Sequence, residues 1–132
     1  MSGENLDVVR SIYAGWGKGD FSRSDWAHPD IEFGYVGGPE PAASTGIGAM
    51  NAVWSEWLRD WVGFRAEPVE YRVLEPDRIL VLVRNRGRGR LSGVEFEERS
   101  VGNYFELDSG LVTKLVVYLD GARALADLGL AE

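Results

Sequence analysis

Few side chains in this sequence are suited to proton transfer. His28 is the only histidine of the 132 residues, and cysteine is absent. The lack of cysteine excludes disulfides, thiolate metal sites and a cysteine nucleophile, and a single histidine disfavours a histidine-based metal site. Imidazole can act as a general acid or base near neutral pH, but His28 precedes Pro29 and Asp30 and could instead bond a loop carbonyl. We expect neither a metal nor a cofactor, and both interpretations of His28 stay open.

Aromatic side chains form a second group with a chemical use. The chain has five tryptophans, a high number for its length. Tryptophan and tyrosine provide an apolar wall with one polar group each, which suits a small-molecule site, although the same rings could simply fill a core. We predict that the group lines a pocket. The residues assigned to ligand binding are Tyr13, Trp16, Trp26, Phe33, Trp54, Trp57, Arg84, Phe105 and Tyr118.

The charges argue against a nucleic-acid partner. The formal net charge is -7, and an acidic surface repels a phosphate backbone. Four arginines at positions 84, 86, 88 and 90 alternate and so share one strand face, where the glutamates at 95, 97 and 98 could pair with them. A second possibility is that Arg84 and Glu97 point inward as a polar pair, since buried charges need partners.

The helices that would position these residues follow from apolar spacing. Leu6, Val9, Tyr13 and Trp16 predict a first helix that ends near Gly17. We expect a short second helix over residues 21–27. A third helix over residues 47–61 carries an apolar stripe, with Gly63 as its C-cap. Asp120 is a good N-cap for a short C-terminal helix that ends at Gly129.

Strands are predicted where the apolar period changes to two. A short strand covers residues 31–36 and a loop covers 37–42. Four strands then run over residues 64–74, 78–86, 94–107 and 111–119, and the third is long enough to need a bulge, for which Gly102 is the expected site. Consecutive strands joined by short turns indicate an antiparallel meander.

These elements predict an α+β fold in a single domain over residues 1–132. We expect a cone-shaped, curved, mixed but mostly antiparallel sheet, with three N-terminal helices over its concave face and the short C-terminal helix. No apolar run reaches membrane-spanning length, and the N-terminus lacks the pattern of a signal peptide. The expectation is a cytoplasmic protein with no membrane partner.

The chain resembles the nuclear transport factor 2-like superfamily, and within it the SnoaL-like and ketosteroid-isomerase-like proteins. Five segments carry the resemblance in order: IYAGWGKGDF, HPDIEFGYVGGPEP, STGIGAMNAVWSEWL, NYFELDSGLVTKLVVYLD and DGARALADLGL. They cover about residues 4–130 and imply the cone-shaped fold and a homodimer that pairs through the sheet. No single segment is diagnostic of an activity, because this fold hosts enzymes and binding modules.

Residue-by-residue comparison disfavours ketosteroid isomerase activity. The resemblance places the catalytic base position on Tyr35, the tyrosine donor on Ile12 and the acidic donor on Asn103. That machinery needs a carboxylate base and acidic donors. Tyr35 and Asn103 could still orient a carbonyl oxygen. The epoxide hydrolases of this fold use two aspartates and an arginine, and the central strands here supply Arg84 but no interior aspartate.

The SnoaL-like polyketide cyclases resemble the end of the chain better. Their acid/base aspartate lies just after the last strand, where this sequence has Asp120. The first hypothesis is therefore cofactor-free isomerisation, cyclisation or dehydration of a small hydrophobic cyclic or polyketide-like compound, with Asp120 or His28 moving the proton. The second is a non-catalytic small-ligand-binding or dimerisation module, in which Asp120 is only a helix cap.

Overall fold

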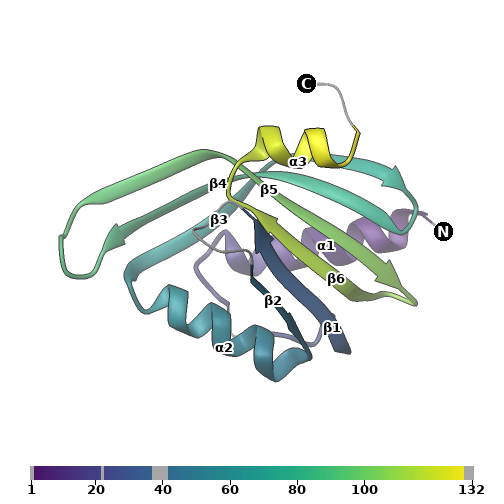
Figure 1. Ribbon diagram of the computed structural model, residues 1–132, viewed down its shortest axis with the longest axis horizontal. Helices are drawn as coiled ribbons and strands as arrows, with labels where there is room; N and C mark the ends of the chain where they lie inside the picture. The colour runs from purple at the N-terminus through teal and green to yellow at the C-terminus, as the bar shows by residue number, and fades with distance from the viewer. Residues whose placement is uncertain (1, 22, 37–41, 130–132) are drawn as a thin grey trace.

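The computed structural model describes residues 2–21, 23–36 and 42–129. Helices α1 and α2 precede most of the sheet, and a shorter helix, α3, follows it (Figure 1). The elements are α1 Ser2–Trp16, β1 Ala27–Val36, β2 Ala42–Thr45, α2 Ile47–Leu58, β3 Trp61–Glu75, β4 Arg78–Gly89, β5 Glu95–Asp108, β6 Leu111–Tyr118 and α3 Gly121–Asp127.

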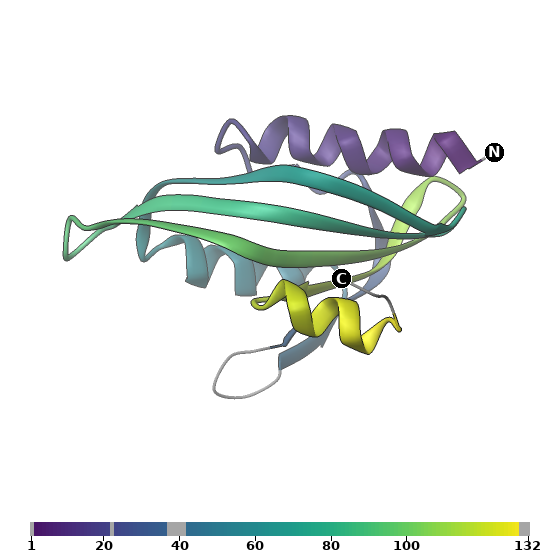
Figure 2. The ribbon, with the colours of Figure 1, turned by 90° about the horizontal axis from the view of Figure 1, so that it is seen from above.

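The strands form one six-stranded sheet in the order β2-β1-β6-β5-β4-β3. The run from β3 to β6 is the predicted antiparallel meander, while β1 pairs with β6 in parallel and with β2 in antiparallel orientation. The long strands β3, β4 and β5 run side by side, and the sheet is curved (Figure 2). The prediction of a curved, mixed, mostly antiparallel sheet in an α+β fold is therefore confirmed.

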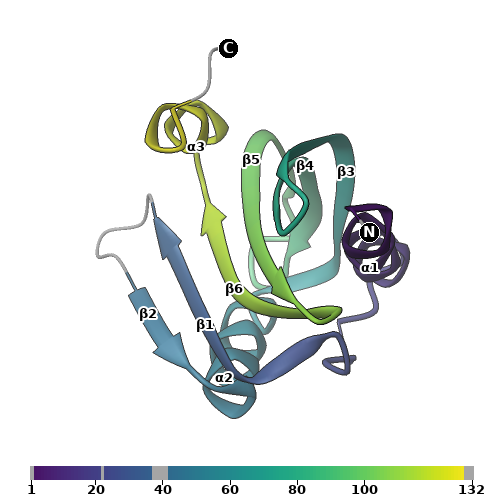
Figure 3. The ribbon, with the colours of Figure 1, turned by 90° about the vertical axis from the view of Figure 1, so that its right-hand side faces the viewer.

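Each face of the sheet has its own hydrophobic cluster. On one side, Val81 of β4 clusters with Val9 of α1 and Met50 of α2, and we call this side the helix-pair face. On the other side, Leu80 clusters with Leu125 of α3, and we call this side the α3 face. Neighbouring residues of β4 serve different clusters because successive side chains of a strand point to opposite faces. Figure 3 shows α3 well apart from α1 and α2.

The predicted helix over residues 21–27 is wrong. The described part of this segment is turn and irregular structure, and β1 already begins at Ala27. Local bonds replace a helical ladder: the Trp26 indole N–H donates to the Arg23 carbonyl, and Arg23 pairs with Asp25 two residues along. Two N-terminal helices are therefore present where three were expected.

A helix end, the position of a bulge and an additional strand also differ from the sequence prediction. Helix α2 ends at Leu58, and Gly63, with φ +65, lies at an irregularity of the β3–β4 pairing rather than at a helix C-cap. The bulge expected at Gly102 lies closer to the hairpin, where the β4–β5 register shifts between Val83 and Asn85. Strand β2 was not predicted, since residue 42 was assigned to a loop whose residues 37–41 lie outside the described part of the chain.

Across the described residues, no helix is both long and apolar enough to cross a membrane.

Candidate functional site

The structure brings six of the predicted ligand-binding residues together on the helix-pair face. Trp16 of α1 is the centre of the group, with its ring centroid 5.1 Å from that of Tyr13, 5.4 Å from Trp54 and 5.9 Å from Trp26. Phe21, which the sequence analysis did not select, stacks on Trp16 at 5.8 Å. The predicted members of this aromatic cluster are Tyr13, Trp16, Trp26, Phe33, Trp54 and Phe105.

These rings fill the interior among the described residues. Phe105 is fully buried, and Tyr13 and Trp16 are each only 3% exposed. Face-to-edge contacts such as that of Tyr13 on Phe105, at 6.1 Å, are the arrangement that aromatic quadrupoles favour in packed cores. In this structure the rings therefore act as core packing.

Three predicted ligand-binding residues do not join the cluster. Tyr118 is buried on the α3 face with Leu80. Arg84 is four residues after Leu80 on β4, and every second side chain of a strand points to the same face, so Arg84 also lies on the α3 face. There its guanidinium donates to Glu67 at 3.0 Å. The inward-pointing pair of Arg84 with Glu97 is therefore not formed. The side chain of Trp57 lies outside the described residues.

The alternating arginines are mostly paired, as predicted, but partly with other residues. Arg88 bonds Glu95 at 3.1 Å on the neighbouring strand. Arg86, like Arg84, uses Glu67 of β3. The sequence did not indicate Glu67, because its position beside these arginines comes from the β3–β4 register.

A buried polar pair lies among the aromatic rings. The amide Nδ2 of Asn103 donates to the Tyr13 hydroxyl at 2.7 Å, and Asn103 is 3% exposed. Its Oδ1 atom is buried and has no hydrogen-bond partner among the residues that the structure describes. Burial raises the pKa of Tyr13 well above its ordinary value of 10, against a smaller lowering by the Asn103 bond. Tyr13 therefore keeps its proton, which no described residue accepts.

The sheet register aligns further predicted residues with this pair. Asn103 is opposite Val117 of β6, and Val117 is opposite Tyr35 of β1. On its other side Asn103 is opposite Val81, which is opposite Tyr71 of β3. Residues opposite each other in a sheet share a face. Tyr35, Asn103 and Tyr71 thus form one transverse row on the helix-pair face.

The tyrosine in contact with Asn103 is one residue away from the position inferred from the resemblance. That comparison placed the donor on Ile12, whereas the structure brings the Tyr13 hydroxyl to Asn103. The helical spacing of Val9, Tyr13 and Trp16 already placed Tyr13 on the apolar side of the first helix. That periodicity is the sequence signal that could have selected it.

His28 and Asp120 are separate from the polar pair. The Nδ1 atom of His28 accepts the backbone N–H of Asp30 at 3.0 Å, so it anchors its own segment. A carboxylate oxygen of Asp120 accepts the Ala122 N–H at 2.9 Å and caps α3. The cap is confirmed. Neither side chain is hydrogen-bonded to Tyr13 or Asn103.

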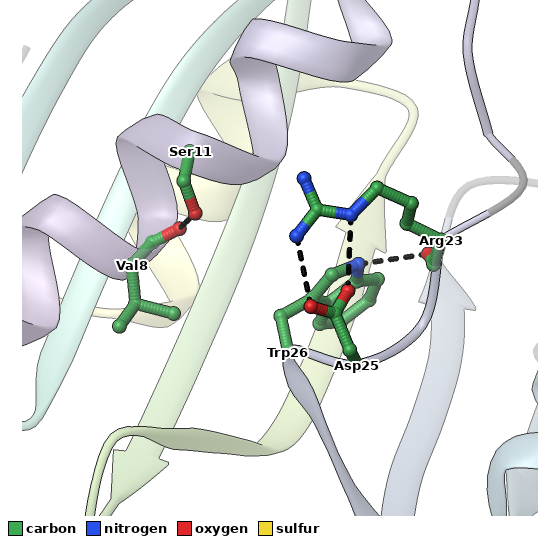
Figure 4. A network of polar contacts seen from close by, with 5 residues as sticks. All are labelled: Val8, Ser11, Arg23, Asp25 and Trp26. Carbon is green, nitrogen blue, oxygen red and sulfur yellow. Dashed lines mark hydrogen bonds and ion pairs between the residues drawn. The ribbon is translucent and has the colours of Figure 1, made fainter.

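Two shallow recesses, both open to solvent, flank the segment between α1 and β1. The first, of about 260 Å³, lies between Ser11 on α1 and Arg23. The second, of about 210 Å³, extends to Asn51 and Trp54 of α2. Figure 4 shows the side chain of Arg23 fixed by its two bonds to Asp25 above the Trp26 indole, across from the Ser11 hydroxyl that donates to the Val8 carbonyl. These volumes include space that is open to solvent, so neither recess is an enclosed ligand pocket of ordinary size.

Among the residues that the structure describes, no three histidine, cysteine or acidic side chains gather where they could hold an ion.

The arrangement of the elements defines the class of this protein: the chain has the nuclear transport factor 2-like fold. No protein-family model matches the sequence, and no curated protein matches it. Solved structures that are similar in fold include three at 17% to 19% sequence identity. Identity this low establishes the fold alone.

The first of these is a nuclear transport factor 2-like protein of unknown function from Burkholderia pseudomallei, with a TM-score of 0.76 at 17% identity over 93% of this chain and 95% of that one. The second is a putative SnoaL-like polyketide cyclase from Jannaschia sp. CCS1. Its TM-score is 0.75 at 18% identity, over 94% of this chain and 90% of that one. The third is TerC co-crystallised with polyporic acid. Its TM-score is 0.75 at 19% identity, over 95% of this chain and 97% of that one.

Proposed function

We propose that this protein binds a small planar ring compound at the Tyr13–Asn103 pair, and that the compound carries a hydrogen-bond acceptor next to a donor. The observation that carries the proposal is the unpartnered Oδ1 atom of Asn103, buried beside a tyrosine hydroxyl in an otherwise apolar cluster. Buried polar atoms are almost always hydrogen-bonded, so an exception points to strain, a missing water or a ligand.

The pair presents two complementary groups. The Tyr13 hydroxyl accepts from Asn103, so its own proton is available to a ligand acceptor such as a carbonyl oxygen. The Asn103 Oδ1 atom is available to a ligand donor such as an N–H or O–H. A primary amide or a neighbouring hydroxyl and ketone supplies both groups at adjacent atoms.

Binding requires that an aromatic ring move aside. Three rings contact the Tyr13 ring, and two of them, Trp16 and Phe105, are buried. The third, Tyr71 of β3, is only half-buried, with its centroid 6.2 Å from that of Tyr13. Rotation of Tyr71 is therefore the least disruptive way to expose the pair, since exposed side chains change rotamer most readily.

Binding is better supported than acid/base catalysis. Proton transfer needs a base within hydrogen-bond reach of the reacting group. The hydrogen-bond partners of Tyr13 and Asn103 are each other, and His28 and Asp120 are used in local backbone bonds. Tyr13, with its raised pKa, is a hydrogen-bond donor rather than a base. The crystal of TerC with polyporic acid supports a small organic compound as the ligand class.

Isothermal titration with two matched probes tests the proposal. 2-Naphthamide has a carbonyl next to an N–H, whereas 2-acetonaphthone keeps the carbonyl and replaces the amide nitrogen by a methyl group. We expect the amide to bind about tenfold more tightly, because one hydrogen bond to a buried acceptor contributes about 1 kcal/mol or more.

A double variant and a control tie this preference to the pair. Tyr13→Phe with Asn103→Leu should abolish the preference for the amide. Tyr118→Phe removes a hydroxyl on the α3 face, where no hydrogen bond to it is formed among the described residues, and should change nothing. Failure of both probes to bind, or an unchanged preference in the double variant, would refute the proposed function.

A further inference from the structure

An arginine lies over the ring that covers the polar pair. The guanidinium carbon of Arg10, on α1, is 5.5 Å from the centre of the Tyr71 ring. This contact is in the range of a cation–π interaction. Arg10 is exposed, and it forms no ion pair within the described ranges 2–21, 23–36 and 42–129. Its charge is therefore positioned by the ring and not neutralised by a carboxylate.

The position of Arg10 connects the protein surface to the buried pair. Arg10 precedes Tyr13 by three residues on α1, which places their Cβ atoms about 5–6 Å apart on one side of the helix. Tyr71 contacts both side chains, and Tyr13 in turn contacts Asn103. A ligand that displaces the Tyr71 ring to reach Asn103 would pass directly beside the guanidinium.

A guanidinium held in this way is ready to bind an anion. A contact with the face of a ring uses none of the five N–H donors of the guanidinium, so they can bind a carboxylate or an ionised hydroxyl. The protein as a whole carries a formal net charge of -7, which repels anions in general. A local cation at the site is therefore required if the ligand is acidic.

We propose that Arg10 determines specificity by binding an acidic group of the ligand, so that the site prefers anionic ring compounds to neutral ones. This inference rests on the proposed function. The ligand class becomes a planar ring that carries an acidic oxygen at the outer end, above Tyr71, and a polar atom for Asn103 at the inner end.

Titration with 6-carbamoyl-2-naphthoate and 2-naphthamide tests the inference, because both probes carry the amide for Asn103 and only the first adds an acidic group at the opposite end of the ring. In the intact protein at pH 7.5 and low salt, we expect the anion to bind about fivefold more tightly, because one exposed ion pair contributes up to about 1 kcal/mol. Arg10→Gln should remove this preference by weakening the anion alone and leaving 2-naphthamide within about twofold. The preference should also shrink when salt screens the charge.

Arg123→Gln is the matched control, because it removes the same charge from α3 on the far face of the sheet. This variant should retain the preference for the anion. Equal binding of both probes by the unmodified protein would overturn the role of Arg10 but leave the proposed function intact. An equal loss for both probes in Arg10→Gln would also overturn it, because Arg10 would then act only by supporting Tyr71. If neither probe binds, the proposed function fails and this inference fails with it.

Discussion

The half-satisfied pair of Tyr13 and Asn103 predicts an unusual pattern of stability. Tyr13→Phe removes the hydroxyl to which the Asn103 Nδ2 atom donates, so neither polar atom of a side chain that is 3% exposed keeps a partner among the described residues. Adding Asn103→Leu removes those atoms altogether and leaves an apolar side chain of similar size. The second change should therefore restore stability that the first one removed.

The magnitudes follow from the burial of the pair. Leaving a buried polar group without a partner costs about 1–3 kcal/mol, whereas replacing both partners by apolar groups of similar shape is close to neutral. We expect Tyr13→Phe to lower the free energy of unfolding by about 2 kcal/mol. The double variant should return to within about 1 kcal/mol of the unmodified protein, or exceed it.

Urea unfolding followed by tryptophan fluorescence measures both changes. With an m-value of about 2 kcal/mol/M, a loss of about 2 kcal/mol lowers the midpoint by about 1 M. Tyr118→Phe is the control, because it removes a tyrosine hydroxyl that forms no hydrogen bond among the described residues, and it should shift the midpoint by much less. A double variant that is less stable than Tyr13→Phe alone would refute the reasoning, since it would show that Asn103 stabilises the fold through contacts other than the Tyr13 bond.

Four further expectations concern the rest of the molecule. Asp120→Ala should lower the free energy of unfolding by about 1 kcal/mol in urea, whereas Asp120→Asn should hardly change it, because asparagine caps a helix about as well. Equal losses in the two variants would show that the cap is unimportant. Trp54→Ala should cost about 2–3 kcal/mol, below the range for a fully buried ring, and an unchanged midpoint would contradict its contact with Trp16. Burial, followed by the Glu106 bond, raises the pKa of Tyr104 to about 12. The unfolded state, in which the pKa of tyrosine is near 10, therefore loses this proton at lower pH, and stability should fall as pH rises from about 10 to 12. Constant stability over this range in urea unfolding at alkaline pH would refute this expectation. A homodimer through the sheet, implied by the resemblance, predicts a light-scattering mass near twice 14.6 kDa, and a monomer mass would exclude it.

Much of the fold could be predicted from the chain because it depends on local periodicity. The apolar spacing of the first helix and the period-two meander correspond to α1 and to strands β3 to β6. The α3 cap was also predictable, since an aspartate before a glycine and an apolar helix satisfies a free backbone N–H through a bond within two residues. By contrast, residues 21–27 were assigned to a helix, although short-range bonds of Arg23 and Trp26 compete there with helical ones.

The candidate site depended on contacts that no local pattern contains. The sequence by itself determined that Tyr13 lies on an apolar helix face, that aromatic residues are abundant and that no cysteine is available. Only the tertiary structure decided that Tyr13 meets Asn103, ninety positions away in the chain, and that Arg84 and Tyr118 lie on the opposite face. The physical reason is that facing and partner choice depend on strand register and on bulges, where a shift of one residue exchanges the two faces of a strand.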